Sequence, residues 1–273
     1  MRYSTLLPVF LLLTAGLLAE TDPAAVQKQQ KDLERRESRE LQKVDQAEEL
    51  ERIKVRTRER DELAKVQRDT NATAGTATVA VLTTGSFGAI DTAKLAQLKF
   101  AEDEVRNLVQ NQLNAEVTIR FAGERNAINR KYALERAKLE AQQLEGDDAA
   151  KQREQAGKSA EITAKYQEQL DDLALEQETE SAKLRFSHTT KINAAERDLT
   201  AFSAKFMLAQ SAKGAAANFN PTADPEYAKL SATRDAARGA LETALDELRA
   251  KISARRTDLE NAREDDLAKV TGS

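Results

Sequence analysis

The uncharged stretch NATAGTATVAVLTTGSFGAI, residues 71–90, lies between two highly charged parts of the sequence. It is rich in Thr and Val, which favour extended backbone over helix, and Gly85 and Gly88 are typical of turns. Within it, Thr76–Leu82 is a candidate strand. We therefore expect a short non-helical insert at about 71–90 that joins a first long helix to a second, and a strand at Thr76–Leu82, a loop and a contact tip all fit it.

The composition of the 273-residue chain is typical of long helices and coiled coils. Charged residues of both signs make up 32% of it and aromatic residues 4%, and the formal net charge is −4. A mean hydropathy of −0.62 leaves enough apolar residues for narrow seams between helices but not for a thick core. Intrinsic disorder is the competing interpretation, and sustained apolar periodicity argues against it. No block of basic residues indicates a nucleic-acid partner.

Residues 1–19 have the arrangement of a secretory signal peptide. Arg2 supplies a positive charge, Leu6–Leu18 is apolar, and Ala19 suits the cleavage position. The apolar run is shorter than the ~20 residues that span a bilayer, although an uncleaved anchor helix is the alternative. We expect cleavage before Glu20, export to the periplasm or the extracellular space, and no stable membrane span afterwards. Because the chain has no Cys, disulfides and thiolate metal sites are excluded.

The segment from 20 to 70 is expected to form the first long helix, with Pro23 in its first turn. Its apolar row has a spacing of eleven and consists of Leu33, Val44, Val55 and Val66. Eleven residues fill three helical turns, so this spacing keeps the row on one face. The seam is thin, and we expect the helix to depend on a partner helix.

Residues 91–213 are expected to form a long helical hairpin that turns at Gly146. In its first arm the apolar seam consists of Val117, Phe121, Ile128, Tyr132 and Leu139. In its second arm the eleven-residue row consists of Ile162, Leu173, Leu184, Ala195 and Phe206. Gly146 suits the C′ position of the first arm, and Asp147 suits the N-cap of the second.

Residues 214–225 are expected to form a loop, and 226–273 a C-terminal helix. The apolar spacing here changes to that of a conventional coiled coil, with rows Leu245, Ile252, Leu259 and Leu241, Leu248, Ala262. Short breaks between four long helices favour antiparallel neighbours. We therefore predict an all-α, elongated antiparallel long-helix bundle or coiled coil. One packed domain, two crossed hairpins and one long hairpin with splayed ends all fit the pattern.

The sequence contains no pattern that carries catalytic chemistry. His188 is the only histidine and follows Leu184 by four residues, at the edge of an apolar row. A catalytic or metal-binding histidine needs an acid–nucleophile pair or a second ligand, and none is suitably spaced. Asp171-Asp172 lacks the glycine of a calcium loop, and Gly85–Gly88 lacks the lysine of a phosphate loop. We predict no catalytic, cofactor-binding or metal-binding residue, no cofactor and no enzyme activity.

Two functions from different classes fit this architecture. The first is an exported coiled-coil structural or protein-interaction protein, a scaffold or spacer that binds a protein partner or a second copy through helical faces. Charges alternate in sign, as at 56–62, and we interpret them as solvated faces rather than as a binding patch.

The second is a periplasmic holdase chaperone. Thr76–Leu82 (TATVAVL), followed by Gly85-Ser86-Phe87, resembles the first strand in the small body of the outer membrane protein H / Skp chaperones. That family begins with its strand, whereas here a helix is expected to precede it. A helical adaptor of an envelope export apparatus is a further alternative, by fold analogy alone.

Overall fold

The computed structural model describes residues 23–84, 92–146, 148–212 and 220–272, and nearly all of them are helical. The predicted all-α, antiparallel long-helix architecture is confirmed. The elements are α1 (Pro23–Thr84), α2 (Thr92–Asn107), the π-helix η1 (Leu108–Leu113), α3 (Asn114–Gln142), α4 (Ala149–Ala212), the 3-10 turn η2 (Pro221–Ala223) and α5 (Pro225–Thr271). The proposed signal peptide lies outside the described residues.

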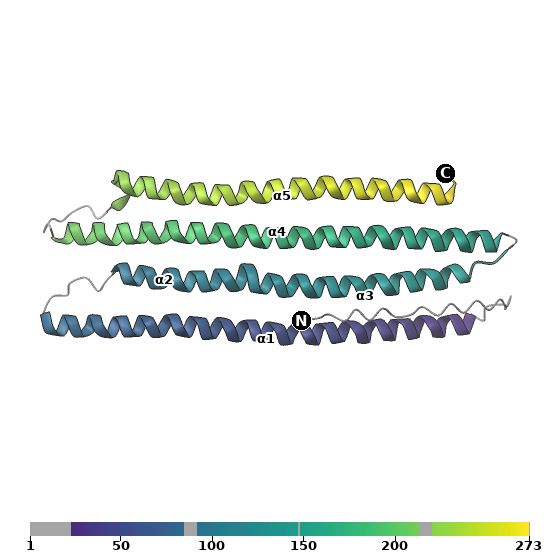
Figure 1. Cartoon of the computed structure of the whole chain (residues 1–273), viewed down its shortest axis with the longest axis horizontal. Helices are drawn as coiled ribbons and strands as arrows, with labels where there is room; N and C mark the ends of the chain where they lie inside the picture. Colours follow the sequence, from purple (N-terminus) through teal and green to yellow (C-terminus); the bar gives the residue numbers. More distant parts are fainter. Residues whose placement is uncertain (1–22, 85–91, 147, 213–219, 273) are drawn as a thin grey trace, which may run out of the picture.

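The helices lie side by side in a single layer, in the order α1, then α2 with α3, then α4, then α5 (Figure 1). Within the described residues, α1 contacts only α2, η1 and α3, and α5 contacts only α4 and η2. The longest helix, α4, has 64 residues and is therefore about 95 Å long. The molecule is thus a plate one helix thick, with two broad faces and two outer edges formed by α1 and α5.

The predicted insert at 71–90 is wrong over the part that the structure describes. Helix α1 continues through Thr84, so Thr76–Leu82 is helical and not a strand. Extending an existing helix adds one hydrogen bond per residue without a new nucleus, and this outweighs the modest penalty of Thr and Val. The turn expected at Gly85–Gly88 lies outside the described residues. The segment that resembled the chaperone strand therefore gives no support to that family.

Helix α4 carries two seams on opposite sides because it is an inner helix of the layer. The predicted row faces α5, and Leu173 in it is 4% exposed. A second row faces away from α5, towards α2 and α3. In it, Leu175 lies against Gly123 of α3, and the Phe186 carbonyl accepts a hydrogen bond from Asn107 of α2. Leu175 and Phe186 are also eleven residues apart, a regularity that was not recognised from the sequence.

The π-helix η1 shifts the seam between α2 and α3 by one residue. Its wider turn is shown by the Asn114 N–H, which bonds the carbonyl of Val109 five residues earlier. Beyond η1, the α3 seam is confirmed, since Phe121 and Tyr132 are 1% and 2% exposed. If the α3 row is extended backward from Phe121 by eleven residues, it predicts that Gln110 is buried. Instead, Gln110 is exposed and Val109 is buried. One extra residue in η1 explains this shift.

The turns are built close to the predicted residues, with one correction. Gly146 has φ +116°, yet the α3 C-cap is Gln143, so Gly146 lies beyond the C′ position. The N–H groups of Gln143 and Leu144 bond carbonyls three residues back, which tightens the end of α3 before the glycine is reached. The Asp148 carbonyl accepts the Gln152 N–H at the start of α4, and Asp147 lies outside the described residues.

Candidate functional site

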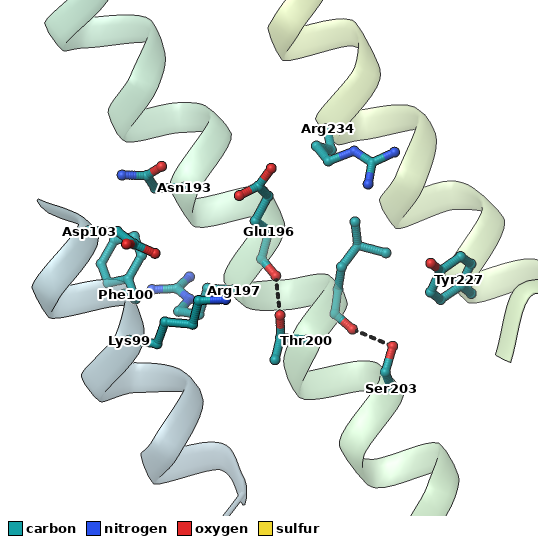
Figure 2. Close-up of a pocket in the computed structure, with 11 residues that line it drawn as sticks. Lys99, Phe100, Asp103, Asn193, Glu196, Arg197, Thr200, Ser203, Tyr227 and Arg234 are labelled. Atoms are coloured by element: carbon teal, nitrogen blue, oxygen red, sulfur yellow. Dashed lines mark hydrogen bonds between the residues drawn. The ribbon is translucent and has the colours of Figure 1, made fainter. Parts of the chain in front are cut away.

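A groove lies near the end of the plate where α2 and α5 begin (Figure 1). Helix α4 forms its floor, and α2 and α5 form its two walls (Figure 2). Its volume is about 370 Å³. The lining residues are Lys99, Phe100, Asp103, Asn193, Glu196, Arg197, Leu199, Thr200, Ser203, Tyr227 and Arg234.

Aromatic rings hold the walls of this groove against its floor. The Arg197 guanidinium lies 4.8 Å from the centroid of the Phe100 ring, a cation–π contact between α4 and α2. On the other side, the rings of Phe202 and Tyr227 are 6.3 Å apart and join α4 to α5. Phe206 stacks on Phe202 at 6.1 Å. These contacts fix the three helices at the end of the plate.

The polar groups of the groove are largely engaged by neighbouring residues. Glu196 accepts a hydrogen bond from Arg238 of α5, and the Asn193 amide donates to Glu104 of α2 at 3.0 Å. The Thr200 hydroxyl donates to the Glu196 carbonyl at 2.8 Å (Figure 2). The lining residues include neither histidine nor cysteine. The arrangement is therefore suited to receiving a polar or aromatic side chain of a partner, and it pairs no nucleophile with a base.

The structure places His188 in the α4 row that also holds Tyr166 and Leu199, at intervals of eleven or multiples of it. Tyr166 and Leu199 are buried, and Tyr166 donates a hydrogen bond to Asp266 of α5 at 2.7 Å. His188 therefore faces α5, where its Nδ1 is buried without a hydrogen-bond partner among the described residues. Among the described residues, no hydroxyl or thiol group bonds this nitrogen.

The adjacent acids have structural partners. Asp171 accepts from Arg130 of α3, and Asp266 accepts from both Tyr166 and Lys269. The hydrogen bond from Lys269, followed by that from Tyr166, lowers the pKa of Asp266. In the described part of the chain, no group of three or more His, Cys, Asp and Glu residues is placed to hold a metal ion.

A charged interface between α1 and α3 is the main feature that was not recognised from the sequence. Glu37 pairs with Arg136, and Glu48, which is 8% exposed, pairs with Arg125. The signal was present, because these two glutamates are eleven residues apart and so are the two arginines. Charged residues that repeat every eleven residues, as the apolar row does, stay on one face of the helix beside that row. They therefore contact a neighbouring helix as well as solvent.

Glu40, Lys131 and Tyr132 extend this interface. Glu40 accepts hydrogen bonds from Lys131 and from the hydroxyl of buried Tyr132, both at 2.9 Å. The Lys131 hydrogen bond lowers the pKa of Glu40 despite its partial burial. Burial would by itself raise the pKa of Glu48, but hydrogen bonds from Arg125 and Arg52 outweigh it, so the pKa is lowered. Both carboxylates are therefore held in the charged form.

No protein-family model, curated protein or solved structure matches this chain. None of the described helices has a stretch long and apolar enough to cross a membrane.

Proposed function

We propose that the protein is an exported scaffold or spacer without catalytic activity, which binds a protein partner through its helical surface. The observation that carries the proposal is the single layer of helices, because no second layer of described helices covers either broad face. The chain exposes 19101 Å², against roughly 11,700 Å² expected for a compact chain of its mass. Such an extended surface is suited to simultaneous contact with a large partner or with several.

The groove in Figure 2 is the part of this surface best suited to anchoring a partner. It combines the rings of Phe100 and Tyr227 with the guanidinium groups of Arg197 and Arg234, and aromatic residues and arginine are enriched at protein interfaces. The rigid aromatic contacts of its walls keep it preformed. Its charged side chains are close to neutral in sum, which favours a peptide or protein surface over a polyanion.

Cross-linking of the mature chain in its native host, followed by mass spectrometry, tests the proposal. A scaffold should yield one defined partner at fixed stoichiometry, with cross-links concentrated on α2, α4 and α5 around the groove. Tyr227→Ala should weaken that cross-linking, whereas Glu178→Ala, on an exposed site of α4, should not. Cross-links spread over many unfolded clients, together with suppression of their aggregation, would instead establish a holdase, and no partner at all would overturn both proposals.

A further inference from the structure

The outer edge of α1 carries two of the three large apolar side chains that are exposed in the described part of the chain. Leu50 and Ile53 are 61% and 47% exposed. They lie on the side of α1 opposite to Val44 and Val55, which are buried against the rest of the layer. Met207 of α4 is the one other large apolar residue that is comparably exposed among those described. An apolar pair at the centre of a free helix edge indicates a site of contact.

The same edge is basic. Lys28, Lys31, Arg39 and Arg60 are exposed on it, and none of them has a carboxylate within ion-pair distance in the described part of the chain. A further exposed cation near the N-terminal end, Arg35, reaches Asp32 only at 3.8 Å. Exposed Asp61 lies beside Arg60, so the uncompensated positive charge of this edge lies on the N-terminal side of the apolar pair.

The outer edge of α5 has the opposite character. Ile252, 5% exposed, faces α4, so the residues two positions to either side face outward. The acids on the outward side are Asp246, which pairs with Arg249, and Glu247, Asp258, Glu264 and Asp265. The small residues on the same side are Ala236, Gly239, Ala240, Thr243, Ala250, Ala254 and Thr257, and exposed Lys251 lies at its margin. Small residues leave room for larger side chains of an approaching helix, and the acids attract a basic one.

The contacts across the layer put complementary parts of the two edges at the same level along the helices. Glu48 of α1 pairs with Arg125, Leu175 lies beside Gly123, and Glu176 pairs with Arg255 of α5. This series of contacts places Leu50 and Ile53 level with Ala250 and Ala254.

A second series of contacts fixes the N-terminal end of α1. Glu37 pairs with Arg136, Lys138 pairs with Glu161, and Tyr166 bonds Asp266. Arg39 is therefore level with Glu264 and Asp265. Helices α1 and α5 also run in opposite directions (Figure 1), so a copy placed beside the plate without rotation continues its antiparallel alternation.

We propose that a second copy of this chain docks with its α1 outer edge on the α5 outer edge of the first. Leu50 and Ile53 then lie over the small residues around Ala250 and Ala254, and Arg39 meets Glu264 and Asp265. The contact joins two different surfaces, so each added copy leaves both edge types free and the layer grows laterally. The inference deepens the proposed function, because it names a second copy of the chain as one partner. It rests on the proposed function in one respect, which is that both use the helical surface of the plate for binding.

Edge-blocked variants of the mature chain test this arrangement by light scattering coupled to size exclusion. Leu50→Glu with Ile53→Glu blocks the α1 edge, and Ala250→Arg with Ala254→Arg blocks the α5 edge. The unmodified chain should grow beyond one copy with concentration, and less so at high salt. Each variant alone should be monomeric, and an equimolar mixture should form a pair of one copy each, with twice the monomer mass. Met207→Glu, on an inner helix, is the matched control and should assemble normally.

The outcomes separate this inference from its rivals. An α5-blocked variant that still dimerises would show that α1 edges pair with each other, and an unmodified chain that stays monomeric at all concentrations would overturn self-docking. Circular dichroism of each variant confirms that loss of assembly is not loss of folding. A chain that stays monomeric but binds a defined partner would support the proposed function and overturn this inference. Lateral assembly of copies with no other partner would support this inference and overturn the proposed binding of a separate protein partner.

Discussion

The two outer helices are attached to the plate in different ways. Helix α5 lies against α4 along an apolar seam in which Leu173, Leu199 and Ile252 are at most 6% exposed. Helix α1 lies against α3 along a seam in which Val44 and Val55 are buried together with Glu48, which Arg125 holds. One edge of the molecule is therefore held mainly by the hydrophobic effect, and the other by the hydrophobic effect together with buried charge-assisted hydrogen bonds.

This difference has consequences for stability. Apolar burial is insensitive to ionic strength and to mild acid, whereas ion pairs near the surface are weakened by both. Removing a partner from a charged pair also leaves the other group desolvated, so each such residue matters beyond its own contact. The attachment of α1 should therefore respond to solution conditions that leave α5 unaffected.

The largest expected effect belongs to the apolar interface. Leu173→Ala leaves a cavity beside α5, and we expect the free energy of unfolding to fall by about 2–3 kcal/mol, the low end for core leucines because the layer is thin. Urea denaturation measures this. Glu178→Ala, exposed and in the same helix, should change the value by less than about 0.5 kcal/mol. Glu176 is a poorer control, because it pairs with Arg255 across the interface. Equal effects of Leu173→Ala and Glu178→Ala would mean that the eleven-residue row is not a buried seam.

Acid should loosen α1 before α5. Hydrogen bonds lower the folded-state pKa values of Glu40 and Glu48 below the ordinary 4.5, so their stabilisation is complete above that pH and is lost as the pH falls through the folded values. Asp266 and Glu176, at the α5 interface, have lowered pKa values too, but both carboxylates are more exposed than that of Glu48. Hydrogen exchange at neutral pH and below pH 4 should show a greater loss of protection in α1. Equal losses in the two helices would remove the distinction.

A single carboxylate should give a smaller change. Glu48→Gln keeps the shape but removes the charge facing Arg125 and Arg52, and we expect a loss of about 1–2 kcal/mol that shrinks at high salt. The matched variant is Glu49→Gln, whose carboxylate is exposed and meets Arg56 at 3.3 Å. Thermal denaturation at low and high salt would detect the difference, and a loss independent of salt would point to packing instead of charge.

The smallest expected effect is a gain in stability. Gly157 lies inside α4, and an added Cβ would meet nothing within 4 Å, so Gly157→Ala should stabilise the protein by about 0.5–1 kcal/mol. Gly123→Ala should gain less, because its Cβ would lie 3.3 Å from Leu175 at the α3–α4 interface. Melting temperatures of the two variants compare an open helix position with an interface position. A larger gain at Gly123 would mean that the inner interface is loosely packed.

Much of the fold could be predicted from the sequence because each long helix has a regular apolar row. Leu173, Phe121 and Tyr132 were recognised as seam residues, and all three are buried. The single layer could not be predicted, since one row per helix fits several packings. It becomes apparent only when α4 is seen to carry a second row, with Leu175 and Phe186 on the side opposite to Leu173. The helical state of 76–82 was missed because local β propensity was given more weight than the continuation of α1.

The candidate groove was beyond prediction for a different reason. Its residues come from three helices, around Phe100, Arg197 and Tyr227, and no short motif connects them. The prediction of no catalytic residue concerned motifs and remains a prediction. The ion pairs of α1 were accessible in principle from the spacing of Glu37 and Glu48, but the identity of the helix they face required the structure.

The one-helix thickness of the plate makes its stiffness depend on direction. Bending along the helix axes strains the backbone hydrogen bonds of helices that extend for about 70–95 Å. Bending across the axes changes only the angles between neighbouring helices and leaves every helix intact. The plate therefore bends easily around a cylinder whose axis is parallel to its helices. It resists bending around a cylinder whose axis is perpendicular to them.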